Sequence, residues 1–245
     1  MPNKRSLSLF IADTDLHVLA NQAVRQCLAS MHFDEVLIFS DLPEAFEGLP
    51  VIPTPKIRSI EAYNDIAVRG LAQHLRTDFV LTVQYDGFIL DSKEFSPHFY
   101  HYDYIGAPWP GQDEHNDVGN GGFSWRSRRL VQAAAALTPP GPIDVEDLLI
   151  CQRLRPELEA QGMRFAPRAV ASHFSVEFPA VPYPTFGFHG LFWLPQVYRN
   201  APDFLVDHLS DRIIQSRSGF LLPALEQLAP ASAERLKARV QRLAA

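Results

Sequence analysis

The first 83 residues alternate short apolar runs with segments of helical spacing, and this alternation restricts the fold more than any other feature. Residues 6–12 and 35–39 read as strands, and residues 16–31 between them repeat apolar side chains at helical intervals. A strand, a helix and a second strand predict a parallel pair with a right-handed crossover. Residues 78–83 form the continuous apolar run of a strand buried on both faces. We therefore expect an α/β protein with a mostly parallel central sheet flanked by helices.

The rest of the chain predicts more helices than strands. Ser59 is the expected N-cap of a helix whose inner face includes Ile60, and Asp144 is the expected N-cap of another. Residues 88–125, rich in aromatics, Gly and Pro, read as ligand-facing loops. Helices are predicted at residues 59–75, 128–137, 144–158 and from 201 onward, with strands at 165 and 170–176. We expect a domain at residues 1–195 and a helical C-terminal extension at 196–245, suited to packing or homo-oligomerisation.

Charge and cysteine content exclude several classes of protein. The net charge is −6, from 22 basic and 28 acidic residues, which argues against a nucleic-acid binder. Cys27 and Cys151 lie in unrelated segments and read as buried thiols in a reducing cytoplasm. Residues 1–5 lack the features of a signal peptide, and no apolar stretch reaches the roughly 18 residues of a membrane-spanning helix. We expect a cytoplasmic protein that contacts a membrane surface only peripherally, to meet a lipid-linked substrate.

Two residues have the chemistry of metal ligands. Asp86 follows the buried strand at residues 78–83, and its carboxylate suits Mg²⁺ or Mn²⁺. The alternative is a turn aspartate that bonds its own backbone, with Gly87 supplying a positive φ. His189 lies between glycines and aromatics and offers an imidazole to Mn²⁺. Its alternative is a half-buried histidine satisfied by a backbone carbonyl.

The segment Gly119-Asn120-Gly121-Gly122 allows backbone to approach a ligand closely. It lacks the lysine of a P-loop and the spacing of a dinucleotide fingerprint. Asn120 and Ser124 would then bind sugar hydroxyls, whereas the alternative is a tight strand connection. Arginines at 126, 128 and 129 suit a phosphate, but we favour their placement on a solvated helix face.

Glu146 and Asp147 have two compatible interpretations. Acidic residues in the first turn of a helix offset the helix dipole. A carboxylate fixed and kept ionised there also suits a base that deprotonates a hydroxyl, and we prefer Asp147, with Glu146 orienting substrate or structure. Trp109 offers a flat face for an acceptor sugar, although core packing explains most aromatics in its segment.

Five motifs in fixed order resemble a family of uncharacterised, mostly bacterial glycosyltransferase-like domains. The likeness covers roughly residues 50–193 and rests on residues 83–87, 102–109, 119–124, 146–147 and 186–190. More distantly, the layout is similar to the Fringe and β-1,3-glycosyltransferase group of GT-A enzymes. There an acidic metal motif, a Gly-Gly stretch, an acidic pair with the base and a late histidine follow one another. The resemblance implies a GT-A-like, Rossmann-type fold.

The resemblance also implies roles for single residues. It places Asp86 and His189 at a divalent metal and Asp147 as the base, with Glu146 beside it. We expect the donor–acceptor junction at Trp109, Asn120, Gly121, Gly122 and Ser124, and the donor nucleotide at Ala12, Asp13, Lys56, Tyr63, Asn64, Gln84, Tyr85 and Asp86.

One departure from the GT-A pattern concerns the metal. These enzymes commonly carry Asp-x-Asp, whereas this chain has Gln84-Tyr85-Asp86 with a single carboxylate. Weak metal affinity before the diphosphate arrives is therefore one expectation. Neutralisation of the leaving group by an arginine or lysine is the other.

Together these features predict a glycosyltransferase of bacterial polysaccharide biosynthesis. It would move a sugar from a nucleotide-diphosphate sugar to a hydroxyl of a glycan or glycolipid precursor, with Mn²⁺ or Mg²⁺ as cofactor and, by resemblance, with inversion. The first alternative is a non-catalytic module that binds a nucleotide sugar or a glycan. A nucleotidyltransferase is disfavoured, because residues 11–15 have neither the glycine nor the arginine of its usual first loop.

Overall fold

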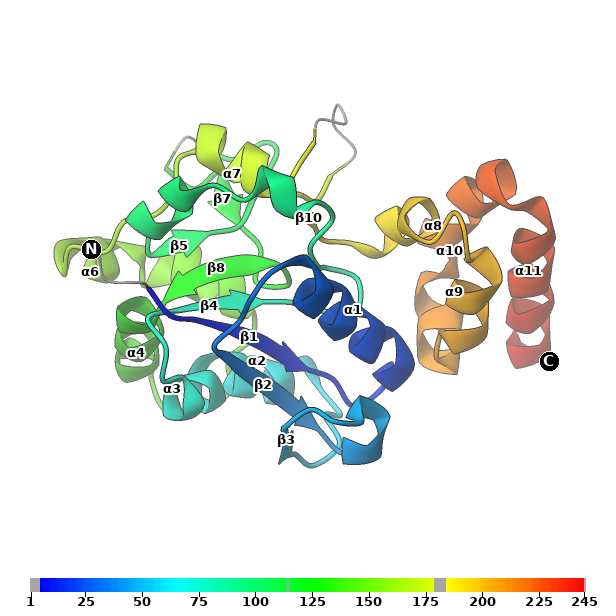
Figure 1. The fold of residues 1–245 in the computed structure, drawn as a ribbon, viewed down its shortest axis with the longest axis horizontal. Helices are drawn as coiled ribbons and strands as arrows, with labels where there is room; N and C mark the ends of the chain where they lie inside the picture. The colour runs from blue at the N-terminus through cyan, green and yellow to red at the C-terminus, as the bar shows by residue number, and fades with distance from the viewer. Residues whose placement is uncertain (1–4, 114, 179–183, 245) are drawn as a thin grey trace.

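A six-stranded sheet forms the centre of the molecule (Figure 1). The computed structural model describes residues 5–113, 115–178 and 184–244. The strands of this sheet, in spatial order, are β3 (Val51–Pro53), β2 (Glu35–Ser40), β1 (Leu7–Ala12), β4 (Phe79–Thr82), β8 (Ser124–Ser127) and β5 (Tyr104–Ile105). The first four in this order are parallel, and β8 is antiparallel to both β4 and β5. The predicted α/β class with a mostly parallel sheet is confirmed.

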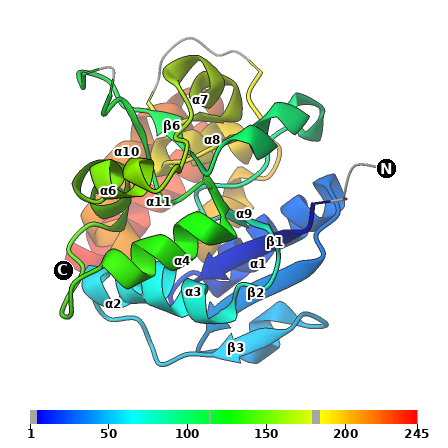
Figure 2. The same cartoon turned by 90° about the vertical axis from the view of Figure 1, so that its left-hand side faces the viewer.

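Helices cover both faces of the sheet (Figure 2). Helix α1 (His17–Ser30) packs on the face that includes Leu9 and Ile11 of β1. Phe10 and Ala12 point to the opposite face, because successive side chains of a strand alternate. That second face is covered by α2 (Ile60–Asp65), α3 (Leu71–His74) and α4 (Arg128–Leu137). All six residues of β1 are consequently buried, as are all four of β4.

Short elements occupy the region between β4 and the C-terminal helices. Two small sheets pair β6 (Ala107–Pro108) with β7 (Val118–Gly119) and β9 (Ser175–Val176) with β10 (Gly187–Phe188). The helices here are α5 (Glu146–Leu148), α6 (Arg155–Ala160) and α7 (Arg168–Phe174). π-helical turns at Ile66–Gly70 and Leu149–Arg153 extend α2 and α5, and 3₁₀ turns occur at Pro43–Phe46, Ser92–Glu94, Pro97–His101 and Leu191–Trp193.

A cluster of phenylalanines fixes β10 against the central sheet. The ring of Phe123 stacks on Phe174 with centroids 5.0 Å apart, and Phe186 lies 5.8 Å from each of them. All three rings are fully buried. Because β10 directly precedes His189, this packing sets the position of that histidine.

The predicted helical C-terminal extension is present (Figure 1). It contains α8 (Leu194–Val197), α9 (Pro202–His208), α10 (Asp211–Leu228) and α11 (Pro230–Ala244). Leu236 of α11 is buried, and Val240 and Leu243 pack against the same core, as their spacing predicts. Among the helices in the described ranges, none is long and apolar enough to span a membrane.

Three local predictions are wrong. Residues 170–176 are helix α7 up to Phe174 and only then the short strand β9; two alanines at 169 and 171 favour a helix whose inner side carries Ala171 and Phe174. Asp144 does not cap a helix, because α5 begins after Val145 without a side-chain cap. Ile60 is 58% exposed rather than inward-facing, although Ser59 does cap α2 through the Ala62 N–H.

Two further predictions concern the cysteines and the N-terminus. Cys27 and Cys151 are buried free thiols, as predicted, and burial raises the pKa of Cys27 to about 12. Residues 1–4, which with Arg5 led us to expect no signal peptide, lie outside the described residues.

Candidate functional site

A pocket of about 580 Å³ lies at the carboxyl ends of β1 and β4. The chain leaves β1 toward β2 on one side, while β4 flanks β1 on the other, so the strand order changes direction here. Open α/β sheets bind ligands at such a switch point. Six residues expected near the donor nucleotide line this pocket: Ala12, Asp13, Lys56, Tyr63, Gln84 and Tyr85.

Asp13 shapes the rim of the pocket. Its Oδ1 accepts hydrogen bonds from the backbone N–H groups of Asp15, at 2.8 Å, and Leu16, at 2.6 Å. Burial raises the pKa of Asp13, although these two donors act in the opposite direction. The carboxylate therefore holds the turn that joins β1 to α1.

Positive side chains reach the pocket from two distant parts of the chain. Lys56 and Arg58 come from the segment after β3, and Arg212 comes from α10. Arg212 is held by Asp15, whose Oδ2 lies 3.0 Å from Nε and 2.9 Å from Nη2. Lys56 and Arg58 have no ion pair with any part of the chain that the structure describes. The positive excess suits an anionic ligand.

Gln84 links this pocket to a second group of polar residues. Its Nε2 donates to the hydroxyl of Tyr63 at 2.5 Å, and its Oε1 lies 3.1 Å from Nε2 of His189. Asn64, expected beside the nucleotide, does not line the pocket. It is buried, and its Nδ2 donates to both backbone carbonyls of residues 143–144 at 2.9 Å, which ties α2 to the segment before α5.

Asp86, His189 and Glu177 form the second group. Oδ1 of Asp86 is buried without a hydrogen-bond partner in the described structure and lies 3.8 Å from Nε2 of His189. Nδ1 of the same ring lies 3.4 Å from Oε1 of Glu177. Burial opposes protonation of His189, but the negative charges of Asp86 and Glu177 outweigh it and raise its pKa. The imidazole of His189 therefore lies between two acidic side chains, Asp86 and Glu177. Glu177 was not among the predicted site residues.

The alternative interpretation of Asp86, as an aspartate in a tight turn followed by a glycine of positive φ, is only partly right. Gln84 and Gly87 exchange backbone hydrogen bonds, so a tight turn is present. Gly87, however, does not have a positive φ. A Cβ there would lie 2.9 Å from Cδ2 of His189, so the glycine is needed for close approach of the histidine.

Asn120 holds both its own loop and His189. Its φ is 77°, in the left-handed region that asparagine tolerates. Oδ1 accepts from the N–H of Gly122 at 2.8 Å, which turns Nδ2 toward Nδ1 of His189 at 2.9 Å. When the ring is neutral, Nδ1 accepts from Asn120 and the proton is on Nε2, facing Gln84; when the ring is protonated, Nδ1 also carries a proton and faces Glu177. The proposed contact of Asn120 with a sugar hydroxyl stays a prediction.

The glycines of this loop leave space that is filled by side chains from other segments of the protein. A Cβ on Gly121 would lie 2.0 Å from Oε2 of Glu146, and one on Gly122 would lie 2.2 Å from Nε2 of His189. Neither position can take a side chain without moving these groups. Ser124 is buried, and its Oγ donates to the Gly121 carbonyl at 3.1 Å.

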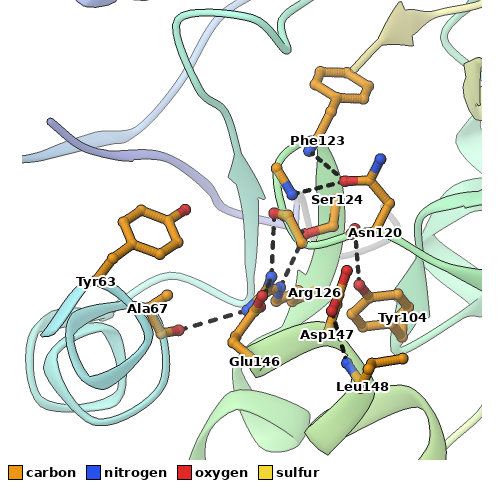
Figure 3. Close-up of polar contacts among 12 residues, drawn as sticks. Tyr63, Ala67, Tyr104, Asn120, Phe123, Ser124, Arg126, Glu146, Asp147 and Leu148 are labelled. Atoms are coloured by element: carbon orange, nitrogen blue, oxygen red, sulfur yellow. Dashed lines mark hydrogen bonds and ion pairs between the residues drawn. The ribbon is translucent and has the colours of Figure 1, made fainter. Parts of the chain in front are cut away.

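Arg126 and Glu146 form a buried ion pair beneath the loop (Figure 3). Their side chains are 1% and 5% exposed. Nε of Arg126 also donates to Oγ of Ser124 at 2.9 Å. Burial disfavours the charge of Arg126, but Glu146 outweighs it and raises the pKa of the guanidinium. Placing residue 126 on a solvated helix face is therefore wrong, because it lies on β8, whose residues are all buried.

The other two arginines considered for a phosphate, Arg128 and Arg129, lie on α4, as favoured. Arg128 is partly exposed, and exposed Arg129 pairs with Asp103. Neither lines the switch-point pocket.

Asp147 lies in the first turn of α5, close to the same loop (Figure 3). Its Oδ1 accepts the N–H of Leu148 at 2.8 Å. Burial raises the pKa of Asp147; the N–H groups of Leu148 and Gly121 act against this, and the charge of Glu177 adds to it. The helix start thus favours the ionised form as expected, but burial is the larger effect. Unlike Glu146, Asp147 has no ion-pair partner within the described ranges.

Trp109 covers the start of the glycine loop. A Cβ on Gly119 would lie 2.1 Å from the indole, so the ring rests directly on that backbone. The indole is partly buried against the core that includes Tyr104 and Leu149. Core packing thus accounts for much of the ring, and its role as an acceptor platform stays a prediction.

The two residues expected to bind a metal, Asp86 and His189, fit that role to different degrees. Asp86 fits a metal contact, because its buried Oδ1 lacks any other partner in the described structure. His189 fits less well, because both ring nitrogens already have hydrogen-bonding neighbours. No group of three metal-ligating side chains occurs among the residues described. Mg²⁺ sites with one carboxylate take their other ligands from phosphates and water.

Asp86, Asn120 and His189 are therefore in contact or close to it, and Asp147 lies near the same loop. None of these four residues lines the switch-point pocket, so their sharing of one ligand-binding hollow stays a prediction. Sequence reasoning did not find Arg58, Glu177 and Arg212, and it misplaced Arg126. No motif surrounds the first three, whereas the burial of Arg126 follows from its place on β8 between Trp125 and Ser127, which are also buried.

The family described as "Protein of unknown function (DUF5672)" matches residues 49–189. The matched segment includes the acidic turn, the glycine loop, the acidic pair and His189. No curated protein sequence is similar to the chain.

Several solved structures share a coarse likeness of fold. A mannosyltransferase from Pyrobaculum calidifontis, in complex with GDP-Man and Mn²⁺, has a TM-score of 0.47 at 10% identity, over 99% of this chain and 74% of that one. Glucosyl-3-phosphoglycerate synthase from Mycobacterium tuberculosis, in complex with Mg²⁺ and UDP, scores 0.43 at 12% identity, over 66% and 68%. The bifunctional IspDF from Campylobacter jejuni scores 0.40 at 11% identity, over 66% and 48%. Scores and identities this low say nothing about substrate or chemistry.

Proposed function

This chain belongs to the DUF5672 family of proteins of unknown function, and we propose that it is a nucleotide-sugar-dependent glycosyltransferase. The observation that carries the proposal is the continuity between two features. The basic pocket at the switch point is joined through Gln84 to the cluster that contains Asp86 and His189, and Asp147 lies close to the glycine loop whose Asn120 contacts His189. An activated sugar needs this combination of an anion pocket and an adjacent carboxylate.

The donor would bind with its nucleotide in the pocket and its diphosphate toward residues 84–86. Tyr63 and Tyr85 offer faces for the base or ribose, and Lys56 offers charge to the phosphates. A divalent metal, if bound, would be held by Asp86 together with diphosphate oxygens and water, and it would supply positive charge to the departing group.

Asp147 is proposed as the base. Its carboxylate would take the proton of the acceptor hydroxyl while that oxygen bonds to the anomeric carbon and the bond to the diphosphate breaks. Attack from the opposite side inverts the anomeric centre. Glu146 takes no part in this step, because its charge is committed to Arg126.

The wider biological assignments belong to the same proposal. We propose that residues 1–195 form the catalytic domain and 196–245 the extension. The acceptor is a glycan or glycolipid precursor in bacterial polysaccharide biosynthesis, met in the cytoplasm or at a membrane surface. Assembly through the C-terminal helices is part of the same hypothesis.

A thermal-shift screen of UDP-, GDP-, CMP- and dTDP-sugars, with and without Mn²⁺, tests donor binding. A ligand that binds the native state raises the melting temperature, and K56A should weaken the shift. D147N should keep the shift and lose sugar transfer. A shift without transfer in the wild type would instead indicate a non-catalytic binding module, and no shift with any donor would end the proposal.

A further inference from the structure

Helix α10 of the C-terminal extension reaches back to the switch-point pocket. Arg212, in its first turn, lines the pocket together with residues that follow β1, β3 and β4. Ser210, the N-cap of α10, donates to Oδ2 of Asp15 at 2.9 Å, and Arg212 donates to the same oxygen. Two residues of the extension are thereby fastened to the loop that forms the rim of the pocket.

The hydrogen bonds of Arg212 leave part of its guanidinium free. Nε and Nη2 donate to Oδ2 of Asp15, whereas Nη1 makes no hydrogen bond within the described part of the chain. A guanidinium has five N–H donors in a planar fork that matches phosphate oxygens. Asp15 therefore fixes the group while its outer edge stays available to a ligand in the pocket.

We propose that α10 supplies Arg212 to the donor diphosphate, so that the C-terminal extension completes the donor site. This inference rests on the proposed function and adds a source of charge for the leaving group. A turn with one carboxylate offers a divalent metal fewer ligands than a turn with two. An arginine from outside the motif region adds positive charge for the departing diphosphate. The extension is then part of the binding site as well as of the fold.

Nucleotide binding to the full-length protein tests the inference. Isothermal titration with UDP, GDP, ADP and dTDP, and with the matching monophosphates, identifies the nucleotide that binds. R212A should weaken binding of that diphosphate about tenfold, the factor expected for one charge-assisted hydrogen bond. Binding of the monophosphate should change much less, because it lacks the second phosphate. R212K should lie between R212A and the wild type.

Arg235 of α11 provides the matched control. It also pairs with acidic residues, Asp203 and Asp207, but it does not line the pocket. R235A should therefore bind both nucleotides like the wild type. Because the side chain of Arg212 is 68% exposed, R212A should fold, and circular dichroism checks this.

The outcomes separate the two proposals. If the wild type binds a diphosphate and R212A binds it equally well, the inference is wrong and the donor pocket stands. Equal weakening of monophosphate and diphosphate would also overturn it, because that result indicates a merely structural role. If the wild type binds none of the nucleotides, the proposed function fails and takes the inference with it.

Discussion

The charges of Arg126 and Glu146 face each other where water hardly reaches, with side-chain exposures of 1% and 5%. Removing one partner leaves the other charge buried and uncompensated, which costs about 3–5 kcal/mol. We expect R126M to lower the free energy of unfolding by about that amount. The double variant R126M/E146L should lose much less, because no charge is left behind. Urea unfolding of the single and double variants measures the coupling, and strictly additive losses would contradict it.

A second residue-scale prediction concerns the protonation of Asp147. Burial raises its pKa above the usual value of about 4, and the charge of Glu177 adds to that rise. A base must be deprotonated, so activity that needs Asp147 should fall as the pH drops through this raised pKa. E177Q removes a negative neighbour and should move the transition to lower pH. Carboxyl carbon NMR, with D147N for assignment, follows the titration directly, and an unchanged midpoint in E177Q would disprove the coupling.

Individual helices and strands were predictable from the sequence where one regular spacing of apolar residues extends over many residues. The helix at residues 128–137 and the strands of the first β-α-β unit were found within one residue of their ends, because apolar spacing fixes them locally. Residues 170–176 were misread because Val170 and Val176 suggest a strand, whereas Ala171 and Phe174 bury one side of a helix. Only the tertiary contacts of Ala171 and Phe174 decide between a strand and a helix.

Helix α10 allows a test at the scale of one element. Gly219 lies in its middle, exposed, with nothing within 4 Å of the place that a Cβ would occupy, and Pro223 lies inside the same helix four residues later. Glycine inside a helix is less favourable than alanine by roughly 0.5–1 kcal/mol. G219A should therefore stabilise the protein by about that amount in urea unfolding. G122A is the contrasting variant, because its Cβ would meet His189 at 2.2 Å and should destabilise the loop. Stabilisation by both variants would refute this account.

At the scale of the molecule, the sequence could predict which motifs lie close together but not which other residues join them. Asp86, Asn120, Asp147 and His189 were found because each lies beside glycines or at the end of a periodic segment. Glu177 and Arg212 have no such surroundings in the sequence, and their places depend on how α7, β9 and α10 pack. Asn64 was expected at the ligand but ties two segments together, a distinction that only three-dimensional contacts make.

The same packing predicts how the whole chain unfolds. One continuous core joins Leu19 of α1 to Leu205 of α9 and Leu236 of α11, across the expected boundary at residue 195. Trp109, Trp125 and Trp193, the chain's 3 tryptophans, all precede that boundary, so their fluorescence reports on the α/β part. Far-UV circular dichroism also reports on the helices after it.

We expect both signals to change together in urea, because a shared core couples the two parts. L236A removes a side chain that is 0% exposed and should cost about 2–5 kcal/mol, shifting both transitions equally to lower urea. L228A, at a position that is 45% exposed, should change little. A dichroism transition that precedes the fluorescence transition would mean that the extension unfolds on its own. In that case α10 could leave the pocket without unfolding the sheet, and Arg212 would move in and out of the pocket with the ligand.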